Sequence, residues 1–134
     1  LIDLYDPKWP IRSRGSVCPP HFAGENASIV HSIVTEGCVI EGKVENSVLS
    51  SSATVAPGAS VLYSVLMPGA QVCEGAVVEY AIIGENTVVG KGAHIGQAPD
   101  GSESWGVATC GPNINIRDGA SVPAGAMIYT SEEV

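Results

Sequence analysis

Three consecutive lines of 17 residues decide the fold: VENSVLSSSATVAPGAS (44–60), VLYSVLMPGAQVCEGAV (61–77) and VEYAIIGENTVVGKGAH (78–94). Written beneath one another, they place apolar residues in columns, the first of which holds Val44, Val61 and Val78. Gly-Ala pairs form a further column at 58–59, 75–76 and 92–93. Because the element apolar-x-x-Gly-Ala-x-apolar occurs five times between residues 55 and 128, we treat the recurrence as an internal repeat.

A repeat of this length is typical of a coil made from three short strands. Each line divides into strands of about six residues that end in tight turns, and period-2 alternation points one apolar residue of each strand inward. Successive coils then stack through parallel backbone hydrogen bonds, roughly 4.8 Å apart. Glycine at the corners supplies the positive φ of sharp turns, while frequent glycine and β-branched residues argue against helix. The sequence therefore predicts an all-β parallel β-helix of hexapeptide repeats.

The repeat also divides the chain. Residues 1–26 lie outside it and hold four prolines, so we predict a cap over the first coil or a linker from a missing preceding domain. The β-helix domain is predicted over 27–134, with a loop insertion near 97–106, where the polar stretch QAPDGSESWG interrupts the period. The chain opens with Leu1 rather than Met, which fits a segment of a longer protein.

Composition narrows the possible partners. Six basic against fourteen acidic residues give a formal net charge of −8. Nucleic acids and anionic membranes are bound through basic surfaces, so we expect neither as a partner. No run of residues is apolar enough to span a bilayer. The four cysteines lack CxxC spacing, and we expect reduced thiols in a cytoplasmic protein.

The candidate functional residues in this chain are histidines and arginines. His31 and His94 lie between three and four coils apart, or more than about 10 Å within one subunit, and therefore cannot share a metal ion there. No acid–base pair stands out among the carboxylates, so we predict no catalytic residue and no metal site in this chain. Arg12 and Arg14 are the only paired basic residues. They suit a phosphate-bearing ligand or a facing carboxylate, and equally a plain surface pair.

The N-terminal segment carries a more specific signal. LYDPKWPIRS is followed by PPHF, and then by coils that contain NSVL and LMPG. These motifs resemble the start of the β-helix domain of bacterial glucose-1-phosphate adenylyltransferases, and the resemblance covers nearly all 134 residues. The matching positions are Tyr5, Asp6, Pro7, Trp9, Ile11, Pro19, Pro20, Asn46 to Leu49 and Leu66 to Gly69. From the resemblance we expect the β-helix to be left-handed.

The resemblance implies a regulatory and oligomerisation domain of a nucleotidyltransferase that makes ADP-glucose and pyrophosphate from ATP and glucose 1-phosphate for glycogen synthesis. Catalysis, with ATP and Mg²⁺, would belong to an N-terminal domain, so no cofactor is expected in this chain. The implied partners are that catalytic domain, the subunits of a homo- or hetero-tetramer, and a small anionic effector bound between domains. Arg12 and Arg14 are assigned to effector binding or to the domain junction. A non-catalytic paralogous subunit would carry the same motifs.

One alternative stays open. A free-standing hexapeptide-repeat acyltransferase would use His31 or His94 as a base at a trimer interface and bind acyl-CoA along the coils. The loop at 97–106 would serve as its arm. The Trp-Pro-Ile-Arg segment has no role in that interpretation, so we rank it second.

Overall fold

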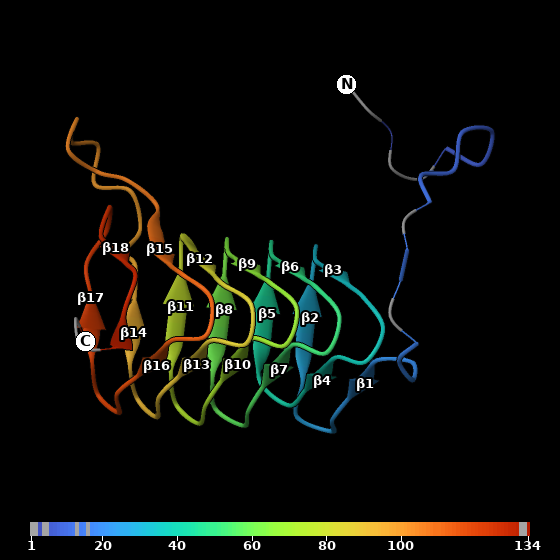
Figure 1. The fold of residues 1–134 in the computed structure, drawn as a ribbon, viewed down its shortest axis with the longest axis horizontal. Coiled ribbons are helices and arrows are strands. Elements are labelled where there is room, and N and C mark those ends of the chain that lie inside the picture. Colours follow the sequence, from blue (N-terminus) through green and yellow to red (C-terminus); the bar gives the residue numbers. More distant parts are fainter. Residues whose placement is uncertain (1–2, 4–5, 13, 16, 132–133) are drawn as a thin grey trace.

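Each turn of the chain contributes one short strand to each of three parallel sheets (Figure 1). The computed structural model describes residues 3, 6–12, 14–15, 17–131 and 134, and 18 strands lie within them. Tyr5, one of the motif positions, lies outside the described residues. Every strand pairs in parallel with the strand of the same sheet in the next coil, which is the topology that the repeat predicts.

The three sheets share one pattern of bounds. The first sheet consists of β1 (Phe22–Ala23), β4 (Val39–Ile40), β7 (Thr54–Val55), β10 (Gln71–Val72), β13 (Val88–Val89) and β16 (Asn115–Ile116). The second consists of β2 (Ser28–Val30), β5 (Lys43–Glu45), β8 (Ser60–Leu62), β11 (Val77–Glu79), β14 (His94–Ile95) and β17 (Ser121–Val122). The third consists of β3 (Ile33–Val34), β6 (Val48–Leu49), β9 (Val65–Leu66), β12 (Ala81–Ile83), β15 (Ala108–Cys110) and β18 (Met127–Ile128).

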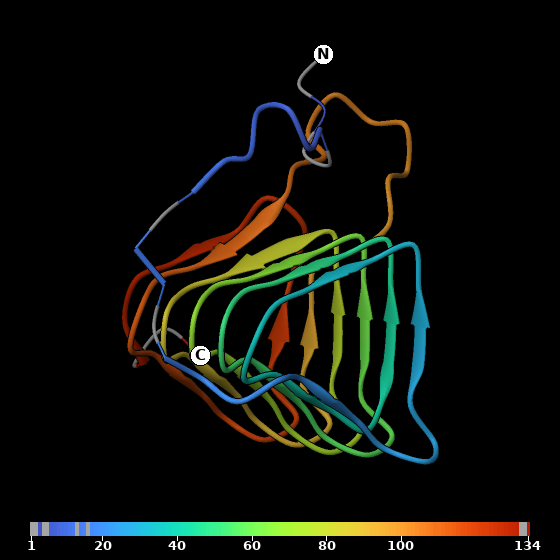
Figure 2. The same cartoon turned by 90° about the vertical axis from the view of Figure 1, so that its right-hand side faces the viewer.

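The coils stack into a triangular prism whose hand can be followed in Figure 2. Seen from the N-terminal end, the chain runs up β2, leftward along β3 and back along the base. It therefore turns counter-clockwise as it recedes toward the C-terminus, and the coil is left-handed. The predicted all-β, left-handed parallel β-helix is confirmed.

Aligned aliphatic side chains fill the interior of the prism. In the second sheet Val44, Val61, Val78 and Ile95 lie in register and are fully buried. Along β12 burial alternates as buried, exposed, buried, so Ile83 points inward and Ile82 outward. The apolar columns of the sequence are therefore the core, and each fully buried aliphatic side chain contributes about 1.5–3 kcal/mol.

Residues at positive φ turn the chain at each of three corners, and between the third and first sheets these are Gly37, Ser52, Gly69, Asn86 and Asn113. Between the first and second sheets Gly58, Gly75 and Gly92 adopt φ of 73°, 70° and 64°, as the Gly-Ala columns predict. Between the second and third sheets non-glycine residues adopt positive φ, and these are His31, Asn46, Tyr63 and Tyr80. Tyr63 and Tyr80 could not be predicted at this corner from the sequence, because tyrosine is rarely found at positive φ.

The ends of the repeat differ in detail from the expected boundaries. Strand β1 lies inside the 1–26 segment, and its Ala23 pairs with Ile40 of β4. Because alanine is small, the sequence showed no column of large apolar residues there. The expected loop leaves the prism between β14 and β15 and is the orange excursion at the upper left of Figure 1. Among the described residues no helix is long and apolar enough to cross a membrane.

Candidate functional site

Aromatic side chains gather along the corner between the second and third sheets. Tyr63 and Tyr80 occupy the same place in successive coils, and their rings stack with centroids 4.8 Å apart and planes 8° apart. Trp105, from the loop between β14 and β15, meets Tyr80 edge-on at 5.8 Å and 82°. Both geometries suit the ring quadrupoles. We call these three residues the aromatic corner.

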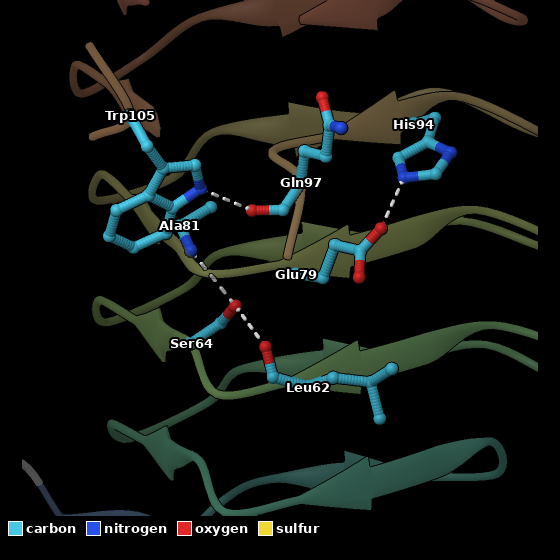
Figure 3. Close-up of polar contacts among 7 residues, drawn as sticks. All are labelled: Leu62, Ser64, Glu79, Ala81, His94, Gln97 and Trp105. Carbon is cyan, nitrogen blue, oxygen red and sulfur yellow. Dashed lines mark hydrogen bonds and ion pairs between the residues drawn. The ribbon is translucent and has the colours of Figure 1, made fainter. Parts of the chain in front are cut away.

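The loop is tied to this corner by its tryptophan. The Nε1–H of Trp105 donates a 2.9 Å hydrogen bond to the carbonyl oxygen of Gln97, so the loop closes on its own base (Figure 3). It departs at Gly96, whose φ is +81° and where any Cβ would overlap the carbonyl oxygen of Glu79. At the loop's outer part, hydrogen bonds from Ser102 lower the pKa of the exposed Asp100 carboxyl.

A serine ladder supports the corner from inside. The hydroxyl of the buried Ser64 donates to the carbonyl of Leu62 at 2.8 Å and accepts from the amide of Ala81 at 3.1 Å (Figure 3). Ser47 repeats this arrangement one coil earlier, because it donates to the Glu45 carbonyl at 2.7 Å and accepts from the Ser64 amide at 3.1 Å. Ser47 and Ser64, which follow the positive-φ residues Asn46 and Tyr63, therefore pair backbone groups that the corner would otherwise leave unsatisfied.

The histidines are separated by the fold. Nε2 of His94 lies 2.7 Å from Oε1 of Glu79 on the outer face of the second sheet, next to the loop (Figure 3). His31 lies at the corner after β2, four strands away along the second sheet from β14, which carries His94. Within the part of the chain that the structure describes, no group of three or more His, Cys, Asp or Glu residues is placed to hold a metal ion.

The two arginines singled out by the sequence are exposed. Arg12 and Arg14 precede β1, in the segment that leaves the prism at the N-terminal end in Figure 1. The ion pairs among the described residues use other cations, namely Lys43, Lys91 and His94. The structure therefore leaves both guanidinium groups at the surface and does not bring them to the aromatic corner.

The cysteines fall into two classes. Cys38 and Cys110 are buried, whereas Cys18 and Cys73 are partly exposed. Burial raises the pKa of the Cys110 thiol to about 11. An inert, protonated thiol at this position has a packing role.

The outer surface of the third sheet is apolar at five of its six outward positions. Its outward positions lie in register across six strands and hold Ile33, Val48, Val65, Ile82, Thr109 and Met127. We call this set the apolar face. Sequence reasoning did not single it out, although the signal was present in the first apolar residue of each Val-Leu or Ile-Ile pair.

The other two sheets present more polar surfaces. Outward positions of the second sheet include Lys43, Ser60 and His94, which lie in one register column. Those of the first sheet are half polar and half apolar, namely Thr54, Gln71 and Asn115 with Phe22, Val39 and Val88. A contiguous exposed apolar surface marks a contact site more often than chance, so the apolar face is the strongest candidate for an interface.

Comparison with known proteins gives a family and two relatives. Residues 19–111 match the family described as GlmU-like, C-terminal hexapeptide. Glucose-1-phosphate adenylyltransferase of Clostridioides difficile (strain 630) is 43% identical over 63 residues, which are 47% of this chain and 16% of that enzyme. The same enzyme of Clostridium perfringens (strain SM101 / Type A) is 47% identical over 60 residues, which are 45% of this chain and 16% of that enzyme. The matched segment thus spans a small part of both relatives.

A solved structure supports the fold. A proposed acetyltransferase from Desulfovibrio desulfuricans G20 superposes with a TM-score of 0.65 at 14% identity, covering 87% of this chain and 28% of the other. At that identity the likeness concerns the β-helix alone.

Proposed function

Since the chain belongs to the GlmU-like, C-terminal hexapeptide family, we propose that it is the regulatory and oligomerisation domain of a glucose-1-phosphate adenylyltransferase. Two relatives of that activity, at 43% and 47% identity, support the parent enzyme. In such a parent, ATP, Mg²⁺ and glucose 1-phosphate would be handled by a separate catalytic domain. This domain would contribute assembly and control.

The apolar face is the observation that carries this proposal. It runs across all six strands of the third sheet, and Ile33, Val48 and Ile82 on it are 37%, 38% and 39% exposed. Flat aliphatic surfaces of this kind are covered when subunits associate, because burying them removes apolar area from water. We assign the face to contact with another subunit of the parent.

Arg12 and Arg14 supply the proposed point of control. Both are exposed cations in a segment outside the prism, on a chain of net charge −8. Guanidinium groups bind phosphate oxygens in bidentate geometry, so they suit an anionic effector at the junction with the catalytic domain.

The control role has a direct test in the full-length parent. We expect Arg12→Gln with Arg14→Gln to reduce the response of ADP-glucose synthesis to inorganic phosphate at least fivefold while leaving the rate without phosphate unchanged. Replacing Lys8, an exposed cation of the same segment, with Gln is the matched control. An unchanged phosphate response in the double variant would remove both arginines from the site.

The acyltransferase alternative rests on one contact. His94 is held by Glu79 at 2.7 Å beside the loop, which is how a carboxylate orients a general base. Calorimetry of the 134-residue chain with acetyl-CoA separates the two functions. The proposed regulatory domain gives no saturable heat, whereas micromolar binding that His94→Ala abolishes would favour acyl transfer.

A further inference from the structure

The ladder of side chains at the aromatic corner has a gap. His31, Asn46, Tyr63 and Tyr80 follow β2, β5, β8 and β11 and share φ between 44° and 48°. The amides of Asn46, Tyr63 and Tyr80 each donate to the coil before, so the four residues lie in one column. Tyr63 and Tyr80 fill their places with stacked rings, whereas Asn46 holds only a short amide.

One face of Tyr63 is consequently open. Tyr80 covers the face toward the C-terminus, and Tyr63 remains 53% exposed. His31 is the first residue of this column and lies two coils before Tyr63. At about 4.8 Å per coil, the backbones of His31 and Tyr63 are roughly 10 Å apart, and only the short Asn46 side chain belongs to the position between them.

Tyr63 and Tyr80 occupy this column although tyrosine disfavours positive φ. Positive φ is costly for a bulky residue, and Asn46 shows that a residue suited to the turn serves the same corner. Strained residues that a fold retains cluster at binding sites. The strain at Tyr63 and Tyr80 therefore points to a use for the exposed ring.

Polar groups surround the edge of the gap. Asn46 offers an exposed amide with two donors and an acceptor. Glu45, the preceding residue, offers a carboxylate, and Lys43 Nζ lies 3.1 Å from its Oε1. We propose that this gap binds one pyranose ring of an uncharged oligosaccharide, with its C–H face on Tyr63 and its hydroxyls on Asn46 and Glu45.

The charge at the corner selects against a phosphorylated ligand. Lys43 is already paired with Glu45, and Glu79 with His94, so the nearby ion pairs leave no surplus positive charge. The chain as a whole carries −8. A neutral sugar meets no repulsion here, whereas a sugar phosphate or nucleotide does. The inference stands whether or not the parent makes ADP-glucose, because it uses only this corner.

Titration calorimetry of the 134-residue chain with maltohexaose and with cellohexaose tests the inference. We expect saturable binding of at least one, weakened tenfold or more in Tyr63→Ala and retained within threefold in Tyr63→Phe, which keeps the ring face. Tyr129→Ala, at a tyrosine that is 69% exposed on the last coil, is the matched control and should bind normally.

A second variant separates binding from folding. Asn46→Tyr fills the gap with a ring, and its backbone at φ 48° is the same that Tyr63 and Tyr80 already adopt. We expect it to fold, because Tyr63 and Tyr80 already adopt this backbone conformation, and to lose oligosaccharide binding. Absence of saturable binding to both sugars, undiminished binding in Asn46→Tyr, or tighter binding of adenosine monophosphate at Tyr63 would each overturn the proposal.

Discussion

Thr87 shows at the residue scale how a polar side chain enters an apolar column. It is buried in register with Cys38, Ala53 and Ala70, where small residues suffice. In two earlier coils the turn closes through a backbone bond, from Ala53 to Ser50 and from Ala70 to Met67. The Thr87 amide makes the same bond to the Gly84 carbonyl at 3.3 Å. At the following turn the Thr87 hydroxyl bridges the chain, donating to the Gly111 carbonyl at 2.6 Å and accepting from the Ile114 amide at 3.1 Å.

Thr87→Val should therefore be costly although it preserves shape. It leaves the Ile114 amide and the Gly111 carbonyl without these bonds, and we expect the free energy of unfolding to fall by about 1–3 kcal/mol. Thr87→Ser, which keeps the hydroxyl, should retain the larger part of the stability. Urea unfolding followed by circular dichroism measures both, and a Val variant as stable as the parent chain would refute the bridging role.

The buried Cys110 thiol should make the free energy of unfolding depend on pH in the alkaline range. Its folded-state pKa is raised to about 11 from 9.0 by burial. Between these values the unfolded chain loses the thiol proton while the folded chain keeps it, so the free energy of unfolding falls as pH rises. The decline approaches about 1.4 kcal/mol per pH unit from this group.

Cys110→Ala removes that group, and its stability should decline less steeply between about pH 9 and about pH 11. Urea titrations across this range measure the two slopes. Cys73→Ala, at a partly exposed thiol, serves as the control. Parallel declines for Cys110→Ala and the parent chain would show that ionisation of Cys110 is not what weakens the fold.

At the scale of the strand, neighbouring residues have opposite roles. Leu66 is fully buried between Leu49 and Ile83 in its column, while Val65 belongs to the apolar face. We expect Leu66→Ala to lower the free energy of unfolding by about 2–5 kcal/mol, because it leaves a cavity in a rigid stack. Val65→Ala in the isolated chain should cost less than about 1 kcal/mol. Equal losses, measured by urea unfolding, would contradict the assignment of inner and outer faces.

Strands and glycine corners were predictable from the sequence because each depends on local pattern. The Val and Ile columns report which residue of a short strand points inward, and Gly58, Gly75 and Gly92 report a backbone that other residues avoid. The corner at Tyr63 and Tyr80 was missed for the opposite reason. Tyrosine disfavours positive φ, and the stacking and serine hydrogen bonds that compensate it come from adjacent coils.

The candidate sites could be predicted from the sequence only where they depend on spacing along the chain and not on contacts between coils. The separation of His31 and His94 followed from counting coils, whereas the contact of His94 with Glu79 depends on side chains in adjacent strands. The apolar face required knowing that each outward residue is followed in register by another of its kind. Arg12 and Arg14 lie outside the repeat, so the repeat offered no constraint on their position.

In the whole molecule, the residues that hold the coils together are different from those that form the outer surface. Backbone ladders and aliphatic columns hold the coils together, which leaves the outward positions of the three sheets free to vary. One sheet presents an aliphatic surface and the other two present mixed polar surfaces. This asymmetry is the physical basis for assigning assembly to the third sheet.

Sedimentation equilibrium of the full-length parent with Val48→Glu and Ile82→Glu tests this assignment most directly. Burying two carboxylates in an aliphatic contact is unfavourable, so the account predicts that the oligomer proposed for the parent dissociates into smaller species. Val39→Glu is the matched control, since Val39 is as exposed as Val48, at 38%, but points outward from the first sheet. It should leave the mass unchanged. A double variant with the mass of the unaltered protein would contradict the assignment of the apolar face to oligomerisation.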